Sequence, residues 1–241
     1  MITYILPCAG LGTRLGLPYP KEIHRIRPGK SLIDFSLVHA TSSIETTEKV
    51  VIVIAPGKEE VANYVEQSIS DVAAVERVYF NEKYTEWPGS IHSAENHFGS
   101  RNVTLLPDSV LSTKKGELLA HKFEQEFDRG ADLVFAYIEE LDRKRLSNLG
   151  GLNVQNSEVI GFCDKPSIEN PFEFNAFWAA FGFRGEIGEK VLEFMMQSVS
   201  RKKVDLASLE LNVRAFPVET YIDLGTWPSI SEYLQAEKLL E

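Results

Sequence analysis

The chain has 241 residues, 44% hydrophobic and 25% charged, which is typical of a soluble globular protein with room for one large α/β domain. Its formal net charge of −10, from 25 basic and 35 acidic residues, argues against a surface that binds nucleic acid. Only two cysteines occur, Cys8 and Cys163, and no apolar run approaches the length of a membrane span. We therefore expect a protein of the reducing cytoplasm, with no disulfide framework and no membrane or nucleic-acid partner.

The N-terminus predicts a buried strand that runs directly into a glycine-bearing loop. Residues 2–6 are mostly apolar and rich in β-formers, and the strand pattern stops at Pro7. The loop reads Gly10-Leu11-Gly12-Thr13-Arg14. Glycine lets bare backbone N–H groups come close to a polyphosphate, Arg14 adds a planar fork for phosphate oxygens, and Lys21 adds a point charge. The pattern predicts a phosphate-binding loop.

The spacing excludes two other phosphate-binding motifs. A dinucleotide fingerprint requires G-x-G-x-x-G, but Leu15 stands where the third glycine belongs. A P-loop requires G-x-x-x-x-G-K-[ST]. Gly29-Lys30-Ser31 could end one, but His24 stands at the position of its first glycine. The failed fingerprint disfavours a dinucleotide-dependent oxidoreductase.

Helical and strand patterns then alternate. The predicted elements are a helix over 31–43, a strand over 50–55, a helix over 58–69 and a strand over 75–80. This order predicts an α/β fold with a doubly wound, mostly parallel, Rossmann-like sheet that binds ligands at the carboxyl ends of its strands. Gly89 and Ser90 follow, and Ser90 is placed to cap the next helix.

Past residue 100 the polar candidates stand at the ends of predicted elements. These elements are strands over 103–108 and 133–138, a helix over 117–127, a hairpin of 152–154 with 159–162, strands over 174–184 and 213–218, and helices over 187–199 and from 229. The hairpin predicts a small antiparallel extension. Asp108 ends a strand, where α/β sheets hold ligands. Asp164-Lys165 follows the hairpin, Asn175 lies in the aromatic strand, and Asp223 precedes the last helix.

Together these residues resemble the signature of the nucleotidyltransferases that make activated sugars and alcohols, G-x-G-T-R followed by P-K. The loop with Pro20-Lys21-Glu22 looks most like bacterial UTP–glucose-1-phosphate uridylyltransferases. L-P-D at 106–108 and D-x-G-T at 223–226 are similar to motifs of the same enzymes. The short gap from Arg14 to Lys21 is closer to the compact cytidylyltransferases.

The resemblance implies a role for each candidate. Catalytic roles fall to Arg14 and Lys21, nucleotide binding to Ala9, Gly10, Leu11, Gly12, Thr13, Gly89 and Ser90, acceptor binding to Asp164, Lys165 and Asn175, and Mg²⁺ binding to Asp108 and Asp223. The chain departs from the family at two places. Asp164 replaces a glutamate of E-K-P, and Phe177 replaces the glycine of N-A-G.

The implied reaction transfers a nucleoside monophosphate from a nucleoside triphosphate to a sugar 1-phosphate or a similar phosphorylated acceptor, giving an NDP-sugar and pyrophosphate. The second pKa of a phosphate monoester is about 6, so the acceptor is largely dianionic and needs no general base. The chain would form a single domain, 1–241, with a nucleotide-binding half over 1–140 and an acceptor-binding half over 141–241. A homo-oligomer is compatible with the sequence.

Other functions stay open at this point. One is a cytidylyltransferase acting on a phosphorylated alcohol or phosphonate. Another is a non-catalytic sugar-nucleotide-binding regulatory protein, although the joint presence of Arg14, Lys21, Asp108 and Asp223 argues against it. A glycosyltransferase would usually carry D-x-D, and Asp108-Ser109-Val110 lacks the second acid. The sequence does not identify the nucleobase or the acceptor.

Overall fold

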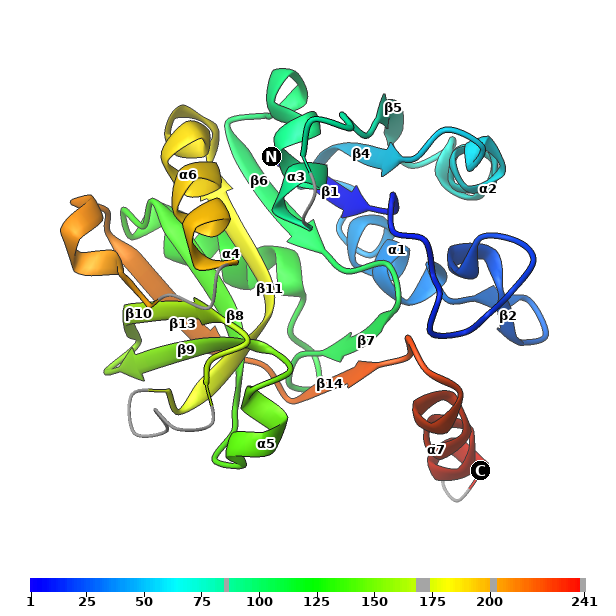
Figure 1. The fold of residues 1–241 in the computed structure, drawn as a ribbon. Coiled ribbons are helices and arrows are strands. Elements are labelled where there is room, and N and C mark those ends of the chain that lie inside the picture. Colours follow the sequence, from blue (N-terminus) through cyan, green and yellow to red (C-terminus); the bar gives the residue numbers. More distant parts are fainter. Residues whose placement is uncertain (85–86, 168–173, 200–202, 239–241) are drawn as a thin grey trace.

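The structure is a computed structural model of the chain, and it describes residues 1–84, 87–167, 174–199 and 203–238. In this part of the chain one mixed sheet has the strand order β12-β10-β13-β8-β11-β6-β1-β4-β5, and β9 pairs with β10 and β11 (Figure 1). Its strands are β1 (Ile2–Pro7), β4 (Thr47–Ile54), β5 (Ala74–Tyr79), β6 (Arg101–Leu105), β8 (Leu133–Glu139), β9 (Gly150–Gln155), β10 (Glu158–Asp164), β11 (Ala176–Arg184), β12 (Val204–Asp205) and β13 (Val213–Pro217).

Four neighbouring strands from the first half of the chain, β5, β4, β1 and β6, run parallel. Residues 50–54 of β4 are fully buried, as expected for a strand that is covered on both faces and must be apolar on both. Pro7 of β1 lies opposite Val53, so the glycine-bearing loop leaves the sheet at the carboxyl edge of these strands. The predicted strands of this half and the position of the loop are confirmed, except that β6 ends at Leu105, so Asp108 lies in the turn after it and does not end the strand.

The other half of the sheet is mixed. β11 runs antiparallel to both β6 and β8, β8 and β13 are parallel, and β9, β10 and β12 join by antiparallel pairing. The sheet is therefore not the mostly parallel one that the sequence predicted. The cause lies in β11, which is buried from Ala176 to Phe183. A strand buried on both faces has the same apolar pattern whichever way its neighbours run.

Helices cover both faces of the sheet. Alternate residues of β1 and β4 point to two apolar clusters, one shared with α1, α2 and α4 and the other with α3 and α6. The helices are α1 (Asp34–Thr41), α2 (Glu59–Ile69), α3 (Pro88–Ser93), α4 (Leu119–Asp128), α5 (Arg143–Leu146), α6 (Gly188–Ser198) and α7 (Trp227–Lys238). In the described part of the chain, no helix combines the length and the apolar character that a membrane span requires.

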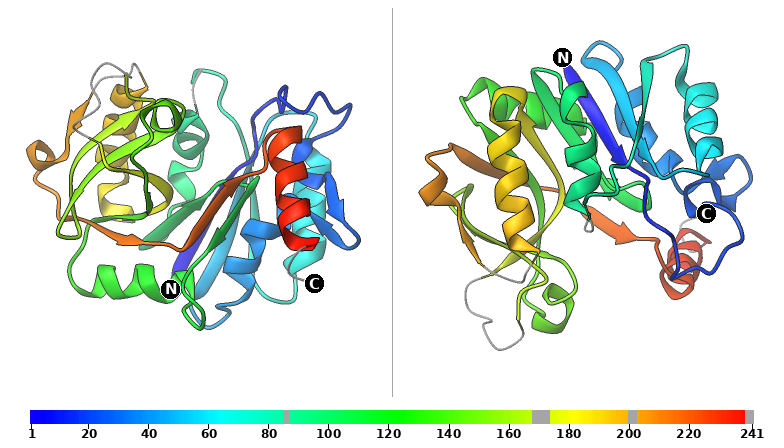
Figure 2. Two further views of the ribbon diagram at one scale, coloured as in Figure 1. Left: turned by 90° about the horizontal axis from the view of Figure 1, so that it is seen from below. Right: turned by 45° about the horizontal axis from the view of Figure 1, so that its top comes forward.

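Two short antiparallel ribbons lie outside the main sheet. In one, β7 (Ser109–Ser112) pairs with β14 (Thr220–Asp223), and in the other β2 (Arg25–Arg27) pairs with β3 (Lys30–Ser31). β13 ends at Pro217, so Asp223 is carried by this second strand and not by the main sheet. Figure 2 shows helix α7 (red) beside the N-terminal segment (blue) and away from the β9–β10 hairpin (yellow-green). Trp227 fastens α7 there by donating its indole N–H to Leu15 O at 3.0 Å.

Candidate active site

The loop after β1 presents unused backbone donors. Within the described residues, the N–H groups of residues 9–14 donate to no other backbone or side-chain group. Gly12 has a φ of +66°, in the left-handed region that favours glycine, and a Cβ there would lie 3.3 Å from Lys21 Cγ. Gly10 has open space around its Cα, so its lack of a side chain leaves room for a ligand. The loop has the geometry of an anion-binding backbone.

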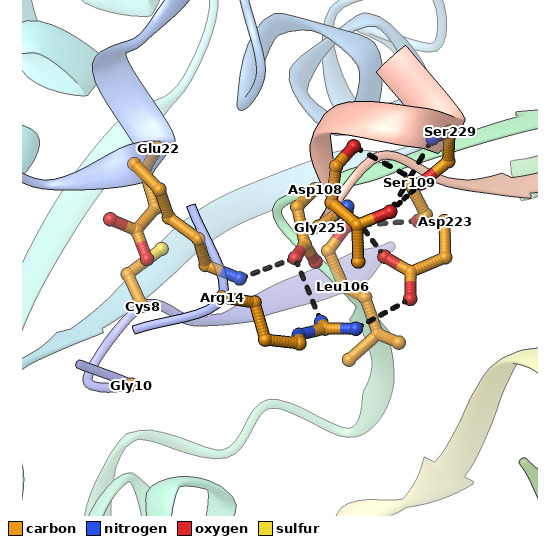
Figure 3. Close-up of polar contacts among 12 residues, drawn as sticks. Cys8, Gly10, Arg14, Glu22, Leu106, Asp108, Ser109, Asp223, Gly225 and Ser229 are labelled. Carbon is orange, nitrogen blue, oxygen red and sulfur yellow. Dashed lines mark hydrogen bonds and ion pairs between the residues drawn. The ribbon is translucent and has the colours of Figure 1, made fainter. Parts of the chain in front are cut away.

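Two cations and two carboxylates meet beside this loop (Figure 3). Lys21 Nζ donates to Asp108 Oδ2. One Arg14 guanidinium nitrogen donates to Asp223 Oδ2 at 3.1 Å, and the other lies 3.9 Å from Asp108 Oδ2. The guanidinium therefore bridges the two carboxylates. All four predicted residues lie within one cluster.

The β7–β14 ribbon brings the two aspartates together. Ser109, next to Asp108, lies opposite Asp223, and Leu224 N donates to Asp108 O at 2.8 Å. Gly225 N donates to Asp223 Oδ1 at 2.7 Å and fixes that carboxylate. A Cβ on Gly225 would lie 2.3 Å from an Arg14 guanidinium nitrogen, so this glycine makes room for Arg14.

The carboxylates keep both basic side chains charged. Burial opposes the charge of Lys21, but Asp108 and, to a smaller extent, Glu22 together outweigh it, and the pKa of Lys21 is raised. Burial likewise opposes the charge of Arg14, and Asp223 raises the pKa of the guanidinium. Burial, together with the two carboxylates, raises the pKa of the neighbouring Tyr221 hydroxyl. Tyr221 is thus a neutral hydroxyl at physiological pH and not a base.

A cavity of about 510 Å³ extends from this cluster towards the second half of the chain. Arg14, Asp108 and Asp223 of the cluster line it together with Asp164 and Lys165. Trp87, Leu106, Asn148, Leu149, Gly150, Trp178 and Tyr221 complete the lining. Lys165 has a φ of +51°, a left-handed conformation that is costly for a residue with a side chain and that clusters at functional sites.

Nine predicted residues are outside this lining. Six of them belong to the loop and the charge cluster beside it, namely Ala9, Gly10, Leu11, Gly12, Thr13 and Lys21. The other three are Asn175, Gly89 and Ser90. The Asn175 amide accepts from Val154 N at 2.9 Å and donates to Val154 O at 2.8 Å, so it holds β9 to the segment before β11. Gly89 and Ser90 are buried within α3. That helix starts at Pro88 with Trp87 as N-cap, so the prediction that Ser90 caps it is wrong.

The sequence reasoning gave no role to two charged residues behind the loop, Lys58 and Glu22, although Glu22 is part of the Pro20-Lys21-Glu22 motif. Lys58 Nζ lies 2.9 Å from a Glu22 carboxylate oxygen, and both side chains are buried. One signal was available, because Lys58 follows β4 at the same carboxyl edge of the sheet that carries the loop. The pairing itself joins residues that no sequence motif links.

The cluster also fits a divalent cation. Asp108 and Asp223 hold a positive group between them, namely the Arg14 guanidinium. Carboxylate oxygens suit Mg²⁺, which usually takes one or two of them together with substrate phosphates and water. Among the described residues, no three His, Cys, Asp or Glu side chains converge on a metal site. The chain would therefore supply two ligands here, and phosphate and water would supply the rest.

Comparison with solved structures shows that this chain has the fold of sugar-phosphate nucleotidyltransferases. Among solved structures it is similar to an apo UDP-glucose pyrophosphorylase, with a TM-score of 0.78, 17% identity, and coverage of 99% of this chain and 98% of that one. A UDP-glucose pyrophosphorylase complexed with UDP-glucose gives 0.76 and 18%, with both chains fully covered. UTP-bound UGPase from Acinetobacter baumannii gives 0.77 and 17%, covering 100% and 95%. No protein-family model and no curated protein matches the sequence.

Proposed function

We propose that this protein is a nucleotidyltransferase that transfers a nucleoside monophosphate from a nucleoside triphosphate to a sugar 1-phosphate, releasing pyrophosphate. The observation that carries the proposal is the convergence of Arg14, Lys21, Asp108 and Asp223 beside a loop with unused N–H donors. Structural neighbours that are UDP-glucose pyrophosphorylases, one with UTP and one with UDP-glucose, support it.

The reaction requires the site to neutralise the negative charges of the phosphates, and it requires no proton transfer from the acceptor. A phosphate oxygen of the acceptor attacks the α-phosphorus, the bond to the bridging oxygen breaks, and pyrophosphate leaves with the electron pair. The acceptor oxygen is already deprotonated. The N–H groups of residues 9–13 with Arg14 and Lys21 would hold the phosphates in line and neutralise charge on the leaving group. Neutral Tyr221 fits a site without a general base.

Asp108 and Asp223 would hold Mg²⁺, which when bound supplies further neutralisation of the phosphates. Arg14 and Lys21 would then exchange their carboxylate partners for phosphate oxygens. The exposed position of the Arg14 side chain allows this exchange.

The acceptor would occupy the far side of the cavity. Lys165 would meet its phosphate and Asp164 its hydroxyls, since both line the cavity together with Arg14. Asn175 would shape this side through its two bonds to Val154. Gly89 and Ser90, the predicted nucleobase contacts, are buried within α3 and outside the cavity lining, so the geometry gives them no contact with the ligand. The short gap between Arg14 and Lys21 favours one alternative within the same reaction type, a cytidylyltransferase with a phosphorylated alcohol as acceptor.

The test is a matrix of five nucleoside triphosphates against a panel of sugar 1-phosphates and phosphorylated alcohols, read by pyrophosphate release with and without EDTA. We expect release that depends on a divalent cation for at least one pair. Binding of a sugar nucleotide with no release for any pair would contradict the proposal and favour a regulatory binding protein.

A further inference from the structure

The phosphate loop is held from behind by a buried ion pair that takes no part in the proposed reaction. Lys58 Nζ lies 2.7 Å from Cys8 O, 2.7 Å from Gly10 O, and 3.0 and 2.9 Å from the two Glu22 carboxylate oxygens. The side chains of Lys58 and Glu22 are only 12% and 1% exposed. Figure 3 shows Glu22 beside Cys8, on the opposite side from Asp223.

These contacts fix which way the loop amides face. In a trans peptide the C=O and the following N–H point in opposite directions. With the carbonyls of Cys8 and Gly10 directed at Lys58, the N–H groups of Ala9 and Leu11 are directed away from it. Neither N–H has an acceptor in the part of the chain that the structure describes. Lys58 therefore turns two donors of the loop outward.

The same ammonium also fixes the segment that carries Lys21. Glu22 follows Lys21 in a short 3₁₀ turn, Lys21–Ile23, and its carbonyl accepts from Ile33 N at 2.9 Å. The carboxylate of Glu22 on Lys58 thus ties this turn to the loop. The ammonium of Lys58 thus positions two groups: the backbone N–H donors of the loop, and the turn from which the Lys21 side chain reaches the phosphate site.

An ion pair of this kind is a poor way to gain stability. Desolvation of two buried charges offsets much of their attraction, and apolar replacement of both is often neutral or stabilising. The pair is better explained by the geometry that it imposes on the loop.

We propose that Lys58 is a positioning residue for the triphosphate, acting through the carbonyls of Cys8 and Gly10 and through Glu22, without touching either substrate. The inference rests on the proposed function, because that function makes a triphosphate the group that the loop binds.

The experiment removes both charges together. Lys58→Met alone would leave Glu22 buried without a counter-ion, so the test uses Lys58→Met/Glu22→Met, in which no unpaired buried charge remains. The control is Lys49→Met/Glu76→Met, which removes a more exposed ion pair whose glutamate also contacts His97. Lys49 lies at the opposite end of β4 from the loop and pairs with Glu76 at 3.1 Å. Calorimetry with UTP and Mg²⁺ measures binding, and steady-state kinetics with glucose 1-phosphate separates the two KM values.

We expect the Lys58/Glu22 variant to fold, to lose about tenfold or more in UTP affinity, and to keep the KM for the acceptor within about twofold of wild type. The control variant should bind UTP like the wild type. A folded Lys58/Glu22 variant with wild-type UTP affinity, or an equal loss in the control, would overturn the inference alone. A wild-type protein that binds none of the five triphosphates would overturn the proposed function and the inference with it.

Discussion

Two ion pairs approach the same loop from opposite sides, and they differ in burial. Lys58 and Glu22 lie behind it with side chains 12% and 1% exposed, whereas Arg14 and Asp223 lie in front with 57% and 37% exposed. An exposed pair contributes little to stability and can change partners at small cost, but a buried pair cannot lose one member without leaving a desolvated charge. The comparison separates a fixed support, Lys58–Glu22, from one exchangeable contact, Arg14–Asp223. The Lys21–Asp108 pair, with side chains 14% and 10% exposed, is closer to the support in burial.

The largest expected effect is the loss of kcat when Asp108 or Asp223, the carboxylates beside the loop, is replaced. Asp108→Asn and Asp223→Asn should each lower kcat by about 10³-fold, because a bound metal ion supplies several kcal/mol of charge stabilisation. The double variant should lose little more than either single one, since both residues serve one cation. Pyrophosphate release and Mg²⁺ binding by calorimetry measure this. A double variant that loses the product of the two factors would contradict a shared metal.

The next largest effect is on the free energy of unfolding, compared between the Lys58–Glu22 pair and the Arg14–Asp223 pair. Lys58→Met should cost about 3–5 kcal/mol, because Glu22 is left as an uncompensated buried carboxylate. Arg14→Met should cost about 0–1 kcal/mol, as for an exposed pair. Unfolding in urea measures both, with the Lys58→Met/Glu22→Met variant as the control that should recover stability. Equal losses at Lys58 and Arg14 would remove the distinction between support and exchangeable contact.

Arg14 should matter much more for catalysis than for stability. Arg14→Ala removes a charged donor that acts as the leaving group develops charge, so kcat should fall by about 10²–10³-fold while the fold is retained. Steady-state kinetics with both substrates measures it. A change confined to KM would mean that Arg14 holds ground state and transition state equally.

The smallest effect is expected at Gly225. A Cβ there would lie 2.3 Å from an Arg14 guanidinium nitrogen and 2.8 Å from Asp223 Oδ1, which are side-chain and not backbone atoms, so Gly225→Ala should change the free energy of unfolding by less than about 0.5 kcal/mol. Arg14 would still be pushed away from Asp223, and kcat should fall by up to about tenfold. Paired unfolding and activity measurements test this. Unchanged activity would show that the bridge between Arg14 and Asp223 does not matter.

Local signals in the sequence were enough for the parallel half of the fold and for the loop. Residues 2–14 carry their structure in short-range patterns: an apolar run, a stop at Pro7, and a glycine at Gly12 where φ is positive. The direction of β11 could not be predicted from the sequence. A strand that is buried on both faces is apolar throughout, so it lacks the alternation of apolar and polar residues that would indicate an antiparallel neighbour.

The site shows the same limit. Asp108, at the end of a predicted strand, and Asp223, before the last helix, were predicted to bind Mg²⁺. In the structure both carboxylates contact the Arg14 guanidinium, and the β7–β14 ribbon, not the main sheet, brings them together. The pairing of Lys58 with Glu22 and with the carbonyls of Cys8 and Gly10 depends on tertiary packing, and no motif announces it.

The β7–β14 ribbon also bears on how the protein is made. Synthesis runs from the N-terminus, so β7 leaves the ribosome long before β14, which is more than a hundred residues further along the chain. Until Thr220–Asp223 emerges, Asp108 has neither its partner carboxylate nor the backbone bond from Leu224. A nascent chain can thus form the parallel strands and the loop early, yet it cannot complete the charge cluster that would capture a triphosphate. Assembly of the site is delayed until most of the fold exists.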